Sequence, residues 1–191
     1  PAVTFEQNTS SLFLLGSFNN FEGSDYEFVQ TADNTWELGE ILLAPGDEFK
    51  FAEKANFMGQ NWGAGDQPGK AALFGPNIMF EQTEAFYSLT FNDKTLAYEI
   101  NFLKFPSIGI IGDATPGGWD TDTDMEDNGD GTFSLLATLI DGELKFRAND
   151  SWDTNWGGTD FPSGLATQDG PNIPVTAGTY KITFNPSTGE Y

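Results

Sequence analysis

The sequence of 191 residues contains no histidine and no cysteine. The absence of His excludes Ser-His-Asp triads, His-ligated zinc sites and imidazole acid/base catalysis. The absence of Cys excludes disulfides, thiolate metal sites and Cys nucleophiles. The sequence also has no apolar run of about 20 residues and no secretory signal pattern. We therefore predict no cofactor and none of these catalytic centres.

Positive charge is scarce as well. Eight Lys and Arg residues stand against 29 Asp and Glu residues, which gives a formal net charge of −21 at pH 7. Such a chain repels phosphates, so nucleic acid is excluded as a partner and an anionic membrane surface is disfavoured. Hydrophobic residues make up 38% of the sequence and include 18 Phe, enough for a packed core. Full intrinsic disorder is therefore not expected.

An internal repeat with a period of roughly 94 residues organises the sequence. The matching pairs of segments are 48–51 with 143–146, 61–63 with 155–157, 75–78 with 170–173, and 87–92 with 180–185. The simplest account is two copies of one domain, at residues 1–104 and 107–191. Pro106 lies between them, where it would interrupt a central strand.

Apolar and polar residues alternate with a period of two in both copies, for example at 144–148 and 179–184. This alternation predicts strands with one buried and one solvent-facing side. Turn-forming pairs such as Asn128-Gly129 separate the strands, and no long segment has helical periodicity. The sequence therefore predicts an all-β fold of two tandem immunoglobulin-like antiparallel β-sandwich domains. Trp36, in an alternating stretch, is expected in the core.

Three tryptophans and two cations of the second copy form the strongest candidate site. Lys145 and Arg147 are two residues apart on a predicted strand, so both leave its solvent-facing side. Trp119, Trp152 and Trp156 lie in Gly- and Asp-rich stretches that we expect to be exposed loops. Exposed rings stack on the apolar face of a sugar, whose hydroxyls accept hydrogen bonds from Lys, Arg and Asn. The pattern predicts a site for a neutral sugar; the alternative is that these Trp residues close the ends of the sandwich.

Acidic residues at 120–130 suggest a weaker hypothesis, a calcium site. The twelve-residue calcium loop is incomplete, because position 12 counted from Asp120 is Gly131. We therefore expect a solvated strand and a hairpin turn there, with no bound metal. Among 29 acidic residues, a carboxylate pair suited to glycoside hydrolysis carries no information. We predict that the protein is not an enzyme.

Five segments of the second copy carry a family resemblance: 110–119 (IIGDATPGGW), 144–152 (LKFRANDSW), 155–158 (NWGG), 170–173 (GPNI) and 177–180 (AGTY). Together they resemble the carbohydrate-binding domains of SusE/SusF-type proteins from the starch-utilisation systems of Bacteroidetes, over nearly all of 107–191. The resemblance implies binding of α-glucan without cleavage, at two aromatic residues beside a cation and an Asn. Matched by motif, these are Trp119, Trp156, Lys145, Arg147 and Asn172, with Trp152 as an alternative to Trp156.

In the first copy the resemblance is weaker. The matched positions are Phe21, Trp62, Lys50 and Asn77. Phe21 stands in place of Trp119, and Ala52 in place of Arg147. We therefore expect the first copy to bind more weakly, to bind with a different selectivity, or not to bind.

The resemblance also implies a location. SusE/SusF-type proteins are anchored at the cell surface in the outer membrane through a lipidated N-terminal Cys, with an immunoglobulin-like domain before tandem starch-binding domains. Because this sequence starts at Pro1 and has no Cys, we expect a soluble fragment of such a lipid-anchored lipoprotein. The implied partners are an α-glucan polysaccharide or oligosaccharide and an outer-membrane glycan transporter complex.

The prediction is thus a non-catalytic starch-binding protein that supplies a polysaccharide-uptake system. One alternative is another glycan such as a β-glucan, and another is a structural or protein-docking spacer. The tilt between the aromatic rings separates the two glycans, because a helical α-glucan needs angled rings and a flat β-glucan needs coplanar ones.

Overall fold

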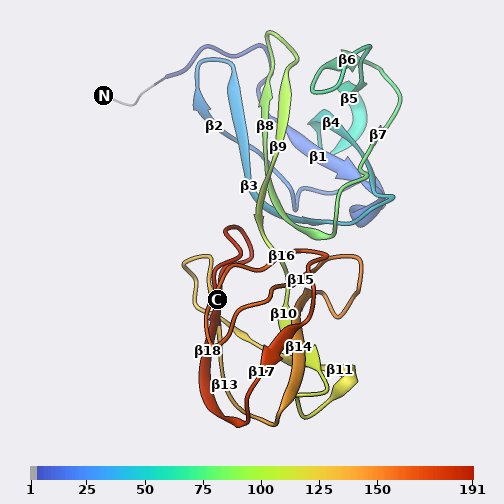
Figure 1. The fold of residues 1–191 in the computed structure, drawn as a ribbon. Helices are drawn as coiled ribbons and strands as arrows, with labels where there is room; N and C mark the ends of the chain where they lie inside the picture. The colour runs from blue at the N-terminus through green and yellow to red at the C-terminus, as the bar shows by residue number, and fades with distance from the viewer. Residues whose placement is uncertain (1–3) are drawn as a thin grey trace. The chain divides into compact units, whose positions relative to one another are not determined.

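The computed structural model describes residues 4–191. The chain divides into two compact units, Pro1–Lys104 and Phe105–Tyr191. Figure 1 shows the first unit in blue to green and the second in yellow-green to red, both built of strands. Between residues 4 and 191 the structure has one helical element, the short 3₁₀ helix η1 (Ser17–Asn19). All strand pairs within its sheets are antiparallel. The predicted all-β antiparallel fold is confirmed.

Two sheets make up the first unit. One has the order β1-β4-β5-β6, with β7 paired to β4, and the other has the order β2-β3-β8-β9. Their bounds are β1 Phe13–Gly16, β2 Val29–Ala32, β3 Thr35–Leu43, β4 Glu48–Lys54, β5 Asn56–Ala64, β6 Ala71–Leu73, β7 Ile78–Met79, β8 Ala85–Asn92 and β9 Tyr98–Lys104.

The second unit repeats this plan. One sheet has the order β11-β10-β14-β15-β16, with β17 paired to β14, and the other has the order β12-β13-β18. Their bounds are β10 Ile108–Gly112, β11 Gly118–Asp124, β12 Glu126–Asp127, β13 Phe133–Leu139, β14 Gly142–Ala148, β15 Asn155–Gly157, β16 Thr167–Gln168, β17 Ile173–Val175 and β18 Gly178–Phe184.

A pair of phenylalanine rings joins the two sheets in each unit. Phe51 of β4 stacks on Phe91 of β8, with ring centroids 4.5 Å apart. Phe146 of β14 stacks on Phe184 of β18, with centroids 4.1 Å apart and planes within 4° of parallel. All four rings are fully buried, and this burial is the main favourable contribution to packing the sheets face to face.

Trp36 lies in the core of the first unit, as predicted. Its ring is buried, and its indole Nε1 donates a 3.0 Å hydrogen bond to the Asp93 carboxylate. The same carboxylate accepts backbone hydrogen bonds from Asn8 and Thr9. Asp93 thereby holds the segment before β1 against the sheet that contains Trp36.

A loop crosses the outer face of each larger sheet at a glycine. A Cβ atom at Gly63 would collide with the carbonyl oxygen of Pro76, and one at Gly157 with that of Pro171. Gly63 and Gly157 follow the buried Trp62 and Trp156 on β5 and β15. The Gly-Pro-Asn-Ile motif found in both copies therefore lies directly on the sheet, where no side chain fits beneath it.

None of the helical structure between residues 4 and 191 has the length and apolar character needed to cross a membrane.

Candidate functional site

The outer face of β14 carries a row of polar side chains. Leu144 and Phe146 point into the core, so Glu143, Lys145 and Arg147 leave the opposite side of the strand. The prediction that Lys145 and Arg147 share one side is therefore correct. Within residues 4–191, Lys145 has no ion-pair or hydrogen-bond partner, which leaves its ammonium group available to a ligand.

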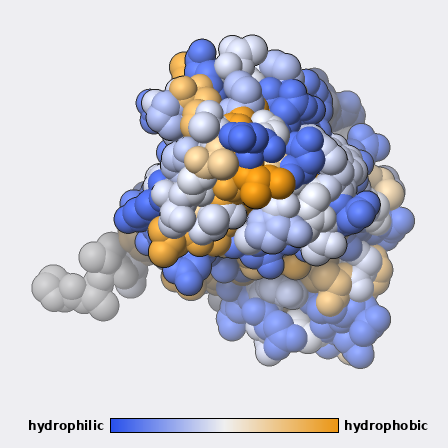
Figure 2. Space-filling view, turned by 60° about the horizontal axis from the view of Figure 1, so that its bottom comes forward, coloured by the Kyte–Doolittle hydropathy of each residue, from blue (hydrophilic) through white to orange (hydrophobic). Residues whose placement is uncertain are grey.

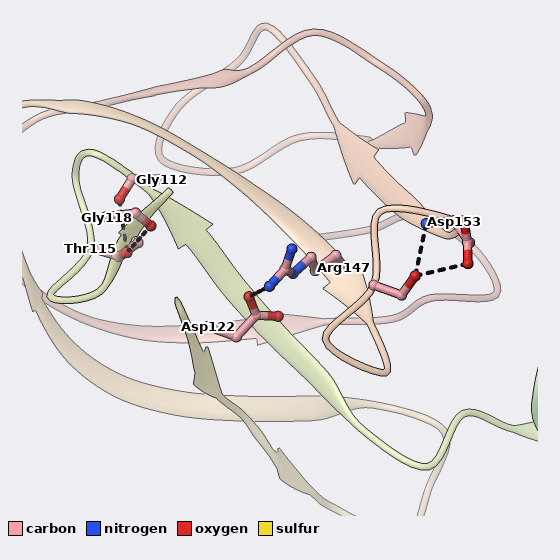
Figure 3. A network of polar contacts seen from close by, with 7 residues as sticks. Gly112, Thr115, Gly118, Asp122, Arg147 and Asp153 are labelled. Atoms are coloured by element: carbon pink, nitrogen blue, oxygen red, sulfur yellow. Dashed lines mark hydrogen bonds and ion pairs between the residues drawn. The ribbon is translucent and has the colours of Figure 1, made fainter. Parts of the chain in front are cut away.

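Arg147, predicted to be solvent-facing, is instead buried and only 6% exposed. Its Nη2 lies 2.5 Å from Oδ1 of Asp122 on β11, the edge strand of the same sheet, and Figure 3 shows this ion pair. Its guanidinium carbon lies 4.9 Å from the centroid of the Trp152 ring, at the distance of a cation–π contact. Arg147 thus holds Trp152 in place from below and contacts solvent little.

Gly109 makes room for this ion pair. A Cβ atom there would lie 2.9 Å from Cβ of Asp122 and 3.0 Å from its Oδ2. Burial raises the pKa of the Asp122 carboxyl above its ordinary value, and the adjacent Arg147 offsets only part of that rise. Burial therefore destabilises the ionised form of the Asp122 carboxyl. Its role in the site is to orient the Arg147 guanidinium.

Trp119 and Trp152 form an aromatic platform beside this pair. Their ring centroids are 6.1 Å apart and their planes are tilted by 30°. Trp119 follows a tight loop in which the Thr115 hydroxyl donates to the Gly112 carbonyl at 2.8 Å and also contacts the Gly118 carbonyl (Figure 3). Trp152 is 46% exposed, which leaves ring surface available to a ligand.

Trp156 and Trp62, both predicted as site residues, are core residues. Trp156 lies on β15 with 7% exposure, and its ring packs against Phe105 and Phe184 at centroid distances of 5.5 and 5.3 Å. Trp62 has 5% exposure and packs against Phe91 at 5.5 Å. Each follows an Asn whose side chain leaves the other side of the strand, so alternation turns the Trp inward. The prediction that Trp156 lies in an exposed loop was wrong, and Trp152 takes its place beside Trp119.

Asn172 and Asn77 occupy equivalent positions away from the aromatic residues. Asn172 Nδ2 donates to Glu143 Oε2 at 2.7 Å, and Asn77 Nδ2 donates to Glu48 Oε2 at the same distance. Glu143 begins the outer row of β14 and Arg147 ends it, about 13 Å away at the rise of an extended strand. Asn172 therefore borders the far end of the face, next to Lys145 along the row.

The first unit has a smaller version of the platform. The rings of Phe21 and Phe57 are 6.2 Å apart and tilted by 42°, and Lys50 Nζ lies 5.6 Å from the Phe57 centroid. Lys50 therefore contacts the aromatic residue here, as Arg147 does in the second unit, whereas Ala52 is fully buried. Burial lowers the pKa of Lys50 below the usual value for lysine.

The acidic stretch forms turns. Asp127 Oδ1 accepts a hydrogen bond from the Gly129 amide, and Asp130 Oδ1 accepts from both the amide and the hydroxyl of Thr132. Among residues 4–191, no group of three or more acidic side chains lies close enough together to hold a metal ion. These carboxylates stabilise the hairpin that leads from β12 to β13.

On the side of the molecule drawn in Figure 2, hydrophobic residues form small islands among hydrophilic ones. Scattered exposure of this kind is ordinary for a protein surface and does not mark an interface. The platforms are distinguished by paired rings next to a cation.

Sequence reasoning missed two residues that build the site. Asp122 was assigned to a solvated strand, yet it anchors Arg147. Phe57 was not selected as a site residue, although it forms half of the aromatic pair of the first unit. The repeat contained the signal for Phe57, because the shift of 95 residues that relates Lys50 to Lys145 also relates Phe57 to Trp152.

An aromatic pair over a cation, on the open face of a small β-sandwich, is typical of non-catalytic carbohydrate-binding modules. Residues 107–191 match the family model described as SusF/SusE starch-specific carbohydrate-binding modules, so the chain is SusE/SusF-like over its second unit. The matched family is a family of binding modules, in agreement with the prediction that the chain is not an enzyme.

Among solved structures, the chain is similar to SusF from Bacteroides thetaiotaomicron. The identity is 22% and the TM-score 0.40, over 99% of this chain and 48% of that one. The chain thus spans about half the length of SusF. No curated protein matches the chain.

Proposed function

We propose that the chain binds α-glucan of the starch type without cleaving it, and that the second unit carries the principal site. The binding face consists of Trp119, Trp152 and Lys145, with Arg147 beneath Trp152 as a positioning residue. The observation that carries the proposal is the Trp119–Trp152 pair, with centroids 6.1 Å apart and planes tilted by 30°. The match of residues 107–191 to starch-specific modules supports the same ligand.

Each residue has a distinct part in this mechanism. The two Trp rings stack on the apolar faces of successive glucosyl units, which removes apolar area from water. Lys145, which has no partner among residues 4–191, donates hydrogen bonds to sugar hydroxyls. Arg147 is a positioning residue: its contact with Asp122 below Trp152 fixes the ring.

The tilt of the rings supports α-glucan over β-glucan. An α-1,4 linkage bends the chain, so the apolar faces of neighbouring units are inclined to one another. A β-1,4 chain is extended and presents its faces in nearly one plane. The 30° tilt in the second unit and the 42° tilt in the first fit the inclined faces.

The domain boundaries, the location and the wider partners belong to the proposal as well. Residues 1–104 and 107–191 act as two carbohydrate-binding modules, the first weaker than the second. The longer protein is a lipid-anchored protein of the bacterial outer-membrane surface that hands glucan to a transporter complex. The support is the starch-specific family match together with the resemblance to cell-surface SusE/SusF-type proteins.

Calorimetric titration of the full chain with maltoheptaose and with cellohexaose tests the ligand. We expect binding of maltoheptaose, weak or no binding of cellohexaose, and no effect of moderate salt, because the ligand is neutral. A preference for cellohexaose would replace α-glucan by β-glucan. No binding of either sugar, together with no retention on a panel of polysaccharides, would favour the spacer.

A further inference from the structure

Phe74 has a backbone conformation that does not suit its side chain. Its φ is +55°, in the left-handed region, and its side chain is 64% exposed. Among residues 4–191, five of the eight non-glycine residues with positive φ are Asn or Asp, which tolerate this region. A bulky aromatic residue held there and left in solvent contributes little to the core, so the fold alone does not account for it.

The equivalent residue of the second unit is Asp169, at φ +56°. The backbone is the same: the Phe74 amide donates to the Asn61 carbonyl at 2.8 Å, and the Asp169 amide donates to the Asn155 carbonyl at 3.0 Å. Asp169 also satisfies its neighbour, because its Oδ1 accepts a 2.9 Å hydrogen bond from Asn155 Nδ2. This position therefore favours an Asp residue.

Replacement of Asp by Phe leaves Asn61 without that partner. Asn155 Nδ2 donates to both Asp169 and the Trp152 carbonyl. Asn61 Nδ2 makes neither bond. The Oδ1 atoms of Asn61 and Asn155 are both buried without a hydrogen-bond partner between residues 4 and 191, so the two units differ at Nδ2. Asn61 is only 6% exposed, yet its Nδ2 has no acceptor among residues 4–191 and still reaches solvent, so it is available to a ligand.

Both residues lie on the face that carries the first platform. Asn61 pairs with Ala52 on β4, on the same side of that strand as Lys50. Leu73 pairs with Trp62, so Phe74 stands next to Asn61 in the register at the end of β6. Phe74 and Asn61 therefore lie on the β5–β6 side of Lys50, the residue that contacts Phe57.

We propose that Phe74 and Asn61 form an additional subsite of the first unit for one further sugar residue of a neutral oligosaccharide. The Phe74 ring stacks on the apolar sugar face, and Asn61 Nδ2 donates a hydrogen bond to a sugar hydroxyl. This inference rests on the proposed function, because the ligand is the same α-glucan. The first unit then binds oligosaccharides that extend beyond the Phe21–Phe57 pair more tightly than shorter ones.

The test uses the full chain with the second platform removed by Trp119→Ala and Trp152→Ala. In that background, Phe74→Asp is expected to weaken maltoheptaose binding about 5- to 10-fold and to leave maltotriose binding unchanged. The same change is expected to raise the melting temperature, because Asp suits the left-handed backbone and gives Asn61 its partner. Phe74→Trp is expected to retain the affinity for maltoheptaose.

Val29→Asp is the matched control, since it places the same charge at an exposed apolar position on the other sheet of the unit. It is expected to leave maltoheptaose binding unchanged. If Phe74→Asp retains full affinity for maltoheptaose, the subsite proposal is refuted. It is also refuted if this variant lowers the melting temperature and the affinity together. Loss of all glucan binding in the background variant also overturns the subsite, while the proposed function stands on the second unit. Failure of the wild-type chain to bind any α-glucan overturns the proposed function itself.

Discussion

The guanidinium of Arg147 lies beneath the indole of Trp152, 4.9 Å from the centroid of the ring, and is held there by Asp122. Trp152 comes from the loop between β14 and β15, whereas Asp122 belongs to β11. The buried ion pair between Arg147 and Asp122 therefore determines how the Trp152 ring is oriented, although this ring is carried by a loop. The tilt between Trp152 and Trp119 depends on this contact.

Replacing Trp152 or Trp119 by Ala is expected to weaken maltoheptaose binding by the second unit strongly. Each change removes a stacking surface, which at an aromatic hot spot costs about 2 kcal/mol or more. The measurement is calorimetric titration of the full chain, with circular dichroism to verify the fold. Leu136→Ala, at an exposed residue on the other sheet of the unit, serves as the control and should not change the affinity. Wild-type affinity in both Trp variants would refute the site.

Trp156→Ala is expected to act on stability. The ring is buried between Phe105 and Phe184, and a large-to-small change in such a core costs about 3–5 kcal/mol. Urea unfolding of the full chain should show a clear loss for the second unit, whereas Trp152→Ala should lose much less. If Trp156→Ala unfolds like the wild type and loses glucan binding, then Trp156 is a binding residue after all.

Acidification is expected to protonate Asp122 before ordinary aspartates. Burial raises the pKa of this carboxyl, so the folded chain binds the proton more tightly than the unfolded chain does. Ionised Asp122 therefore lowers stability at neutral pH, and this cost disappears as the pH falls through the raised pKa towards the ordinary value. Protonation also weakens the hold on Arg147, so glucan affinity of the second unit should fall in the same pH window.

Carboxyl-detected NMR titration measures this directly. Asp130 provides an internal reference of opposite sign, because hydrogen bonds from Thr132 lower its pKa. Asp122 should titrate at the higher pH of the two. Titration of Asp122 at or below Asp130 would show that the attraction of Arg147 outweighs burial.

The two units are expected to bind maltotriose unequally, the second about tenfold more tightly. Its Trp rings offer more stacking area than Phe21 and Phe57, and each such gain is of the order of 1 kcal/mol. The comparison uses two variants of the full chain, one without Trp119 and Trp152 and one without Phe21 and Phe57. Equal affinities, or a tighter first unit, would show that ring size does not rank these sites.

Strand alternation predicted much of the binding face. The period of two in 144–148 placed Lys145 and Arg147 on one side of β14, which the structure shows. The repeat also aligned equivalent positions of the two units. In the structure, the aligned Asn172 and Asn77 donate hydrogen bonds to equivalent Glu residues. Local pattern suffices for such features, because they follow from the backbone of a strand.

Burial across the sheet could not be predicted in the same way. Asn155-Trp156-Gly157 is short and surrounded by turn residues, so its inward-facing Trp resembled a loop residue. Arg147 is buried by Trp152, which folds back from the loop after β14, and by Asp122 of β11. Comparison of the copies would have helped: both have the core Trp, whereas the platform residues Trp119 and Trp152 change to Phe21 and Phe57.

The absence of room above Gly63 and Gly157 has a kinetic consequence. The carbonyls of Pro76 and Pro171 rest on the sheet beside Lys50 and Lys145, so these loops have no room to move toward the strand when a glucan binds. A surface already in its bound shape loses little conformational freedom on association. Encounter is then limited by diffusion and orientation, and glucans of different length will differ mainly in how long they remain bound.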